Sequence, residues 1–206
     1  MTYDYTNTSY DTANMSHTTT SLTDNCLDYS DAKPQRVFDV IPKGTVARVI
    51  LSIRPGGYDD IERNYTGGWV TRNTNTGSMY LSCEYTVLDQ GEYYGQRIWG
   101  FIGLHSAKSD IWATIGRSFI RGILDSARGF SSKDESMAAK AARKIKGFGD
   151  LNGIEFVARI DVEKDKDTDE PRNVIKMAVT KDQKDYTGHD SGYYAGTTSS
   201  TASWSR

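Results

Sequence analysis

The chain has 206 residues and a formal net charge of -2, with 25 Lys and Arg residues against 27 Asp and Glu residues. That length is enough for one ordinary domain with tails, and the charge excludes a protein that coats duplex DNA through overall basicity. No apolar run approaches the roughly 18 residues that cross a bilayer, and the first thirty residues do not resemble a secretion signal. We therefore expect a cytoplasmic protein without membrane contact.

Two tails are predicted to flank a single domain. Residues 1–33 are polar and acidic, without any period in their few apolar residues, so they cannot bury enough surface to offset the entropy of ordering. Residues 185–206 are rich in Gly, Ser and Thr, a composition typical of flexible linkers. The domain is expected to span residues 34–184.

The first half of this domain predicts antiparallel strands. Residues 45–54 alternate apolar and polar side chains and end at Pro55, after which the polar stretch to Gly68 is predicted to be a long loop. A short strand is expected at 69–72 and a stronger one at 79–88. A turn at 89–91 then leads to a hairpin partner at 96–104.

In the second half of the domain the spacing of the apolar residues changes from that of strands to that of helices. A helix is expected from Ser109 to near Gly129 because its apolar residues keep to one stripe, and a second helix is expected over about 134–145. Strands at 153–163 and 173–180 follow. This order predicts a β-rich fold, a small antiparallel barrel of the oligonucleotide-binding (OB) type with a helical insertion at about 108–146 before the closing hairpin.

Groups that could perform catalysis are missing from the sequence pattern. Cys26 and Cys83 are isolated, and the three histidines are scattered, so neither a metal site nor a nucleophile with a base is predicted. Asp59 and Asp60 stand in a polar stretch without a histidine, which leaves a magnesium-dependent nuclease as the least favoured hypothesis. We expect a protein that is no enzyme and needs no cofactor or metal.

Aromatic and basic residues recur together along the predicted strands, which is the combination that binds single-stranded nucleic acid. Bases stack on exposed rings while Arg and Lys contact phosphates. Two alternatives stay open, because Trp99 and Phe101 could instead fill the barrel and the helical arginines could simply be solvated. The candidate nucleic-acid-binding residues are Arg48, Arg54, Trp69, Arg72, Tyr93, Tyr94, Arg97, Trp99, Arg117 and Arg121.

Five segments carry a resemblance to a known family. They are Ile41–Ala47, Tyr80–Leu88, Gly91–Trp99, Asp150–Phe156 and Arg172–Ile175. Together they resemble phage and prophage proteins that bind single-stranded DNA beside phage recombinases. The resemblance implies an OB-type barrel, a non-catalytic role in phage DNA replication or recombination, and a recombinase or helicase as partner. The chain departs from bacterial single-strand binders at its end, which has Trp204 in place of an acidic tip.

A second hypothesis comes from a different class of protein. Tails rich in Tyr and Thr around a β domain also suit a phage structural or assembly protein that associates with copies of itself. Discovery of the protein in purified virions, together with indifference to nucleic acid, would favour this hypothesis.

Overall fold

A computed structural model of the chain describes residues 27, 29–34 and 39–187. The chain divides into two compact units, Met1–Val37 and Phe38–Arg206. In the first unit the described residues form a turn, in which the Ala32 N–H donates to the Tyr29 carbonyl over 3.0 Å. The predicted tails lie almost entirely outside the described residues.

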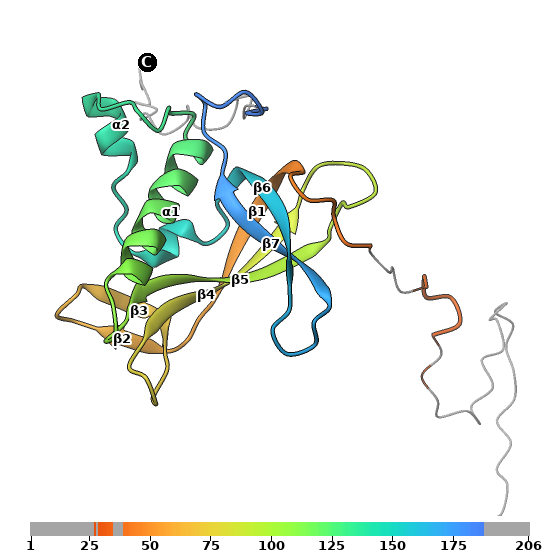
Figure 1. Cartoon of the computed structure of the whole chain (residues 1–206), viewed down its shortest axis with the longest axis horizontal. Coiled ribbons are helices and arrows are strands. Elements are labelled where there is room, and N and C mark those ends of the chain that lie inside the picture. The colour runs from red at the N-terminus through yellow and green to blue at the C-terminus, as the bar shows by residue number, and fades with distance from the viewer. Residues whose placement is uncertain (1–26, 28, 35–38, 188–206) are drawn as a thin grey trace, which may run out of the picture. The chain divides into compact units, whose positions relative to one another are not determined.

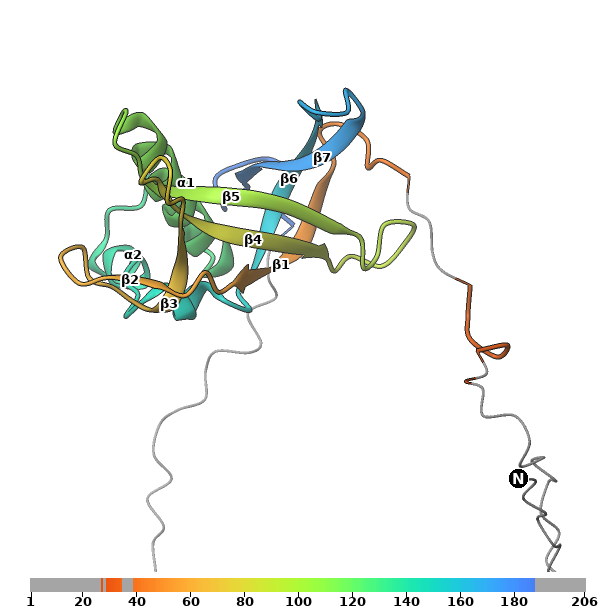
Figure 2. The same ribbon diagram turned by 90° about the horizontal axis from the view of Figure 1, so that it is seen from below.

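The described part of the second unit is built on an antiparallel sheet (Figures 1 and 2). Its strands follow the order β2-β3-β4-β1-β6-β7, and β5 pairs with β4 as well. The strands are β1 (Val46–Arg54), β2 (Tyr58–Asp60), β3 (Tyr65–Arg72), β4 (Met79–Val87), β5 (Arg97–His105), β6 (Glu155–Lys164) and β7 (Pro171–Ala178).

The pairing pattern identifies the fold. β1 pairs with both β4 and β6, β5 returns along β4 as a hairpin, and β7 returns along β6. The sheet curls into a half-barrel that brings β7 close to β5. The predicted class is confirmed: the protein is a small antiparallel barrel of the OB type with helices inserted before the closing β6–β7 hairpin.

The core is formed by the inward-facing side chains of strands in which buried and less buried residues alternate. In β4 every second residue from Met79 to Val87 is buried, and the partner residues on β1 are buried in the same register. Tyr85 meets two further rings, with centroids 6.4 Å from Phe119 and 6.1 Å from Phe156. Aromatic contacts of this kind stabilise beyond their buried area, and here they join the sheet to the inserted helix.

The insertion contains α1 (Ile111–Ala127), α2 (Met137–Ala142) and the short 3-10 helix η1 (Phe148–Leu151). α1 ends close to the predicted position, where Gly129 adopts a φ of +71° and the Phe130 N–H donates to the Asp125 carbonyl over 2.9 Å. α2 is shorter than the predicted 134–145. Its first residue is fixed by Ser136, whose hydroxyl accepts from the Ala139 N–H over 3.2 Å.

The long loop predicted from Pro55 to Gly68 is wrong, because a hairpin of β2 and β3 occupies this stretch. Polar side chains satisfy its backbone. The Asp59 carboxylate accepts from the Gly68 N–H over 2.7 Å, and Asp60 accepts from Arg63 over 2.7 Å. A hairpin held by such local polar contacts does not show the apolar alternation on which sequence analysis relies.

Two glycines bring α1 directly onto β5. A Cβ atom placed on Gly116 would lie 1.8 Å from the carbonyl oxygen of Gly103, so no side chain fits at this crossing. One turn earlier on the helix, Trp112 covers the Cα of Gly103. The backbone contact fixes both the height and the direction of α1 over the sheet.

Replacing each helical glycine of α1 with alanine separates packing from helix propensity. Gly116→Ala is expected to lower the free energy of unfolding by about 1 to 3 kcal/mol, because backbone must move to admit the methyl group. Gly122→Ala is the control, since its Cβ would meet only the Ala178 Cβ at 3.4 Å. The control should gain up to about 1 kcal/mol of helix propensity. Urea denaturation measures both; equal effects would contradict the crossing geometry.

Cys83 reports whether the barrel interior is closed. It is 2% exposed, and burial raises the pKa of its thiol to about 12. Only the thiolate attacks a disulfide reagent, so in a Cys26→Ser variant at pH 8 the remaining thiol is expected to react at the rate of unfolding. Stopped-flow absorbance with an aromatic disulfide measures this rate. Rapid reaction of the native protein, unchanged by added urea, would show an open interior.

The segment after β7 is tied to the helical insertion by Asp182. Its carboxylate accepts from the Thr180 hydroxyl over 2.7 Å, and from the Ser132 N–H and hydroxyl over 3.0 and 2.9 Å. Further along, the Tyr186 hydroxyl donates to the Ser126 carbonyl over 3.1 Å and Asp185 pairs with Arg159 over 2.7 Å. The packed domain therefore continues at least to Tyr186.

These donors, led by the Thr180 hydroxyl, hold the pKa of Asp182 well below its ordinary value of 3.8. A depressed folded-state pKa contributes stability that is present above the unfolded pKa and is lost as the pH falls toward the folded one. Asp182→Asn is therefore expected to melt at a lower temperature than wild type at pH 7, with the two melting temperatures converging below pH 3.8. Circular dichroism melts across this range test it; a constant difference at all pH values would refute it.

Candidate nucleic-acid interface

β5 presents two aromatic residues to the outside of the barrel. Ile98 and Ile102 are each 1% exposed and point into the core, whereas Trp99 and Phe101 are 57% and 66% exposed. Arg97 shares their side of the strand. The alternative in which the two rings fill the barrel is therefore wrong, and the rings are available to a ligand.

The strand register places these side chains in rows across three strands. Positions that face each other in an antiparallel sheet lie about 4.5 to 5.5 Å apart, so each row is a set of direct neighbours. We call the following residues of β1, β4 and β5 the sheet face. Its rows are Arg54, Ser82 and Phe101; Ser52, Glu84 and Trp99; and Ile50, Thr86 and Arg97.

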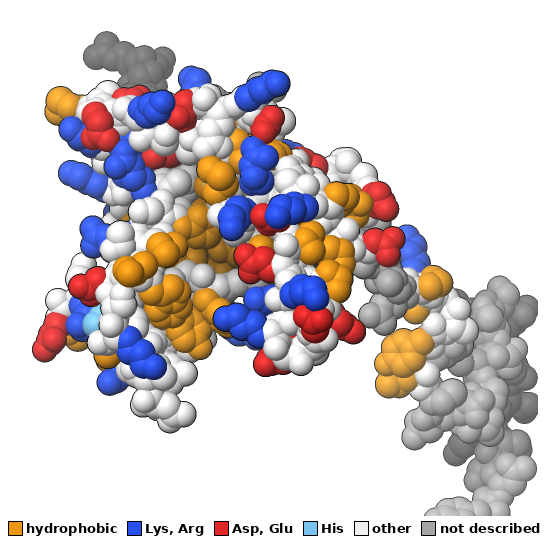
Figure 3. Space-filling model, viewed as in Figure 1, with side chains coloured by type: hydrophobic (Ala, Val, Ile, Leu, Met, Phe, Trp, Pro, Cys, Tyr) orange, Lys and Arg blue, Asp and Glu red, His pale blue; other side chains and the backbone are white. Residues whose placement is uncertain are grey.

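Helix α1 carries exposed apolar side chains of its own, and its Trp112 lies near the sheet. Ile111 and Ile115 are 69% and 61% exposed, and Tyr80 connects the sheet to the helix, with ring centroids 4.9 Å from Phe101 and 6.1 Å from Trp112. Figure 3 shows hydrophobic side chains gathered over α1 and the adjoining sheet, with Lys and Arg around them. The predicted stripe on α1 is therefore only partly buried.

The geometry of α1 explains this division. Successive helical residues turn by about 100°, so when Gly116 faces β5, Phe119 and Ile123 also face the barrel. Ile115 then lies on the flank of the helix. One stripe in the sequence thus serves two surfaces, the core and the exterior.

The sheet face carries modest positive charge. Arg97 approaches Glu84 with Nε 3.3 Å from Oε1, and its side chain remains 60% exposed. Arg54 is exposed at the end of β1. Arg48 lies near the start of β1, where its Nε contacts Asp89 over 3.1 Å. Exposed ion pairs of this kind contribute little stability, so they can be exchanged for phosphate contacts at small cost.

The aromatic and basic candidates outside β5 differ from one another in how exposed they are. Tyr94 is 42% exposed in the β4–β5 loop, but the neighbouring Tyr93 packs against the core rather than standing free as expected. Trp69 is half-buried against the core. Its indole lies so close to Gly149 that a Cβ atom placed on this glycine would be 3.1 Å from Trp69 Nε1. Arg72 lies over the Tyr58 ring, 5.1 Å from its centroid. The structure therefore does not bring Trp69 and Tyr93 onto the sheet face.

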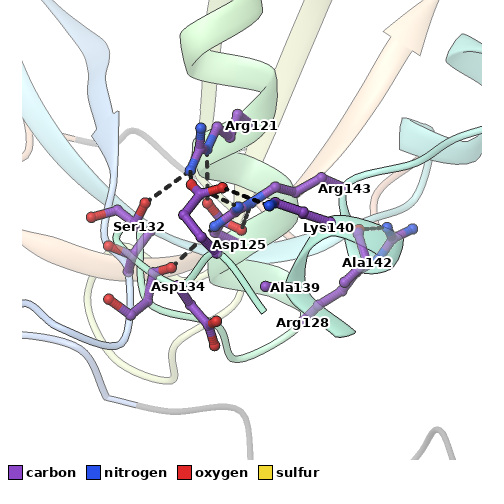
Figure 4. A network of polar contacts seen from close by, with 12 residues as sticks. Arg121, Asp125, Arg128, Ser132, Asp134, Ala139, Lys140, Ala142 and Arg143 are labelled. Atoms are coloured by element: carbon purple, nitrogen blue, oxygen red, sulfur yellow. Dashed lines mark hydrogen bonds and ion pairs between the residues drawn. The ribbon is translucent and has the colours of Figure 1, made fainter. Parts of the chain in front are cut away.

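The two helical arginines have different surroundings. Arg117 is exposed on the flank of α1 opposite Ile115. Arg121 belongs to the polar network of Figure 4, in which it donates to Glu135 over 2.8 Å and to the Ser132 carbonyl over 3.0 Å. The Arg121 guanidinium holds the pKa of Glu135 below its usual range. Arg121 is thus committed to holding the α1–α2 connection.

The centre of this network is Asp125, which is 1% exposed. Its carboxylate accepts from Arg143 Nε over 2.7 Å, and Arg143 also donates to the Ser131 carbonyl over 3.2 Å. Arg128 reaches the Ala142 carbonyl on the other side of α2 (Figure 4). These contacts attach α2 to α1 and explain why several basic residues of the insertion are not free to bind a ligand.

Among residues 27, 29–34 and 39–187, no three His, Cys, Asp or Glu side chains lie close enough to hold a metal ion. Asp59 and Asp60, the residues considered for a nuclease, are engaged in the β2–β3 hairpin. Among the described helices, none is both long and apolar enough to cross a membrane.

Comparison with known proteins adds no identification. No protein-family model matches the sequence, and neither does any curated protein. The functional argument therefore depends on the geometry of the sheet face.

Phe101 belongs to the sheet face and the Tyr80 ring packs against it, although neither residue was among the candidates. The signal for Phe101 was present in the sequence, since it follows Arg97 and Trp99 at the same period of two. Tyr80 could be placed beside it only once the register between β4 and β5 was known.

Proposed function

We propose that the protein is a non-catalytic single-stranded-DNA-binding protein that acts in phage DNA replication or recombination. The observation that carries this proposal is the outward orientation of Trp99 and Phe101 beside Arg97 on β5. In OB folds the second and third strands of the barrel form the surface on which oligonucleotides lie. β4 and β5 hold those two positions here, with the β2–β3 hairpin as an insertion before them.

The chemistry of the sheet face suits a single strand better than a duplex. Exposed rings offer stacking surfaces that accept any base, while a duplex hides its bases from such contact. Charge is local and moderate, which also fits a protein with a negative net charge. The phage setting and a recombinase or helicase partner follow from the sequence resemblance alone and form part of the proposal.

Binding to a fluorescein-labelled oligothymidine of about 20 nucleotides, followed by anisotropy at 50 mM salt, tests the proposal. Trp99→Ala and Phe101→Ala are each expected to weaken binding by about 1 to 3 kcal/mol, roughly 5-fold to 150-fold in Kd, because each removes a stacking surface. Trp99→Phe should retain most of the affinity. Binding of wild type should fall steeply as salt rises.

Met137→Ala is the matched control, because Met137 is 89% exposed on α2, away from the sheet face. It should bind as wild type does. The proposal fails if wild type does not bind at 50 mM salt, or if the control weakens binding as much as Trp99→Ala.

A second candidate function is self-association in a phage structural or assembly protein. The exposed Ile111 and Ile115 favour it, since aliphatic side chains offer no stacking surface to a base. Sedimentation velocity distinguishes the two: dimers of wild type that dissociate in Ile115→Asp, in a protein indifferent to DNA, would support this candidate over the first.

A further inference from the structure

A surface hollow lies where β5 and β7 begin, at the seam of the half-barrel. Its volume is about 220 Å³. It adjoins the sheet face, because Arg97 and Trp99 belong to both. The polar and aromatic side chains that matter in its lining are Asp39, Gln96, Arg97, Trp99, Arg172 and Asn173.

Two largely exposed guanidinium groups line this hollow. Arg97 uses Nε toward Glu84 over 3.3 Å, and Arg172 uses Nε toward Asp165 over 3.6 Å. Both side chains stay at least half exposed, at 60% and 50%. Guanidinium groups that keep this much exposure present paired N–H donors, which match the oxygens of a phosphate.

The wall beneath the arginines is rigid. Asn173 donates to the Ile41 carbonyl over 2.8 Å and accepts from the Ile41 N–H over 2.9 Å. Gln96 Nε2 donates to Asn173 Oδ1 over 3.3 Å and to the Asp39 carbonyl over 3.2 Å. These two acceptors fix the orientation of the Gln96 amide, so the hollow keeps its shape without a ligand.

The same amide leaves an acceptor unused. Gln96 Oε1 is buried and has no hydrogen-bond partner in the described part of the chain. A buried acceptor without a donor is rare in folded proteins.

We propose that this hollow holds one nucleotide unit, with its base against the Trp99 indole and its phosphate between Arg97 and Arg172. The inference rests on the proposed function and makes it more specific, because it assigns a phosphate contact to Arg172 and fixes where along β5 the bound strand crosses to β7. Asp39 adds one carboxylate to the lining, and Glu84 and Asp165 each contact one of the arginines, so a bound phosphate competes with carboxylates for the two guanidinium groups.

The salt dependence of binding separates a phosphate contact from a stacking contact. For single strands, the slope of log K against log salt changes by about 0.7 for each phosphate contact. Arg172→Ala should therefore flatten the slope for oligothymidine by about 0.7, and Arg172→Lys should restore it because the charge returns. Trp99→Ala should weaken binding without changing the slope.

Lys140→Ala is the charge-matched control, since Lys140 is exposed on α2 and makes only a long contact of 3.7 Å to Glu135. Its slope should equal that of wild type. Competition adds a second measurement: thymidine 5′-monophosphate should displace oligothymidine at concentrations where thymidine does not, and Arg172→Ala should reduce that difference, since Arg97 alone then contacts the phosphate. Circular dichroism confirms that each variant is folded.

The outcomes keep the two proposals apart. Oligothymidine binding with an unchanged slope in Arg172→Ala overturns the nucleotide hollow and leaves the proposed function standing. Failure of wild type to bind either oligothymidine or the monophosphate overturns both. Direct binding of the monophosphate, seen as quenching of Trp99 fluorescence, without any binding of oligothymidine supports the hollow and overturns the proposed function.

Discussion

The backbone contact between Gly116 of α1 and Gly103 of β5 is the constraint on which the arrangement of this domain depends. Because no Cβ separates the two elements, the helix lies low enough for Phe119 and Ile123 to fill the barrel. The same contact fixes the rotation of α1 about its axis. Ile111 and Ile115 are thereby directed away from the core and are exposed.

The sheet face owes its geometry to strand pairing. Its side chains project from paired strands whose register is fixed by backbone hydrogen bonds, so rings and charges have a constant spacing before any ligand arrives. Preorganisation of that kind lowers the entropy lost on binding. The polar network around Asp125 acts at a distance from this surface, since it attaches α2 to α1.

Sequence reasoning succeeded where one physical signal was strong and unopposed. The alternation in β1 and β4 and the period of α1 predicted the barrel and its insertion. It could not orient β5, because Ile98 and Ile102 on one side are as apolar as Trp99 and Phe101 on the other. It missed the β2–β3 hairpin, whose contacts are polar, and it missed Arg172, which meets Arg97 only after the sheet has curled.

The helical insertion also divides the charge of the molecule unevenly. Residues 106–154 contain nine Lys and Arg residues against five Asp and Glu residues, a formal charge of +4 within a chain of net charge -2. The rest of the sequence therefore carries -6. A positive segment attracts a polyanion locally even when the net charge of the chain is negative, and salt screens that attraction. Under the proposed function, the insertion would therefore raise the rate of encounter with phosphates at low salt.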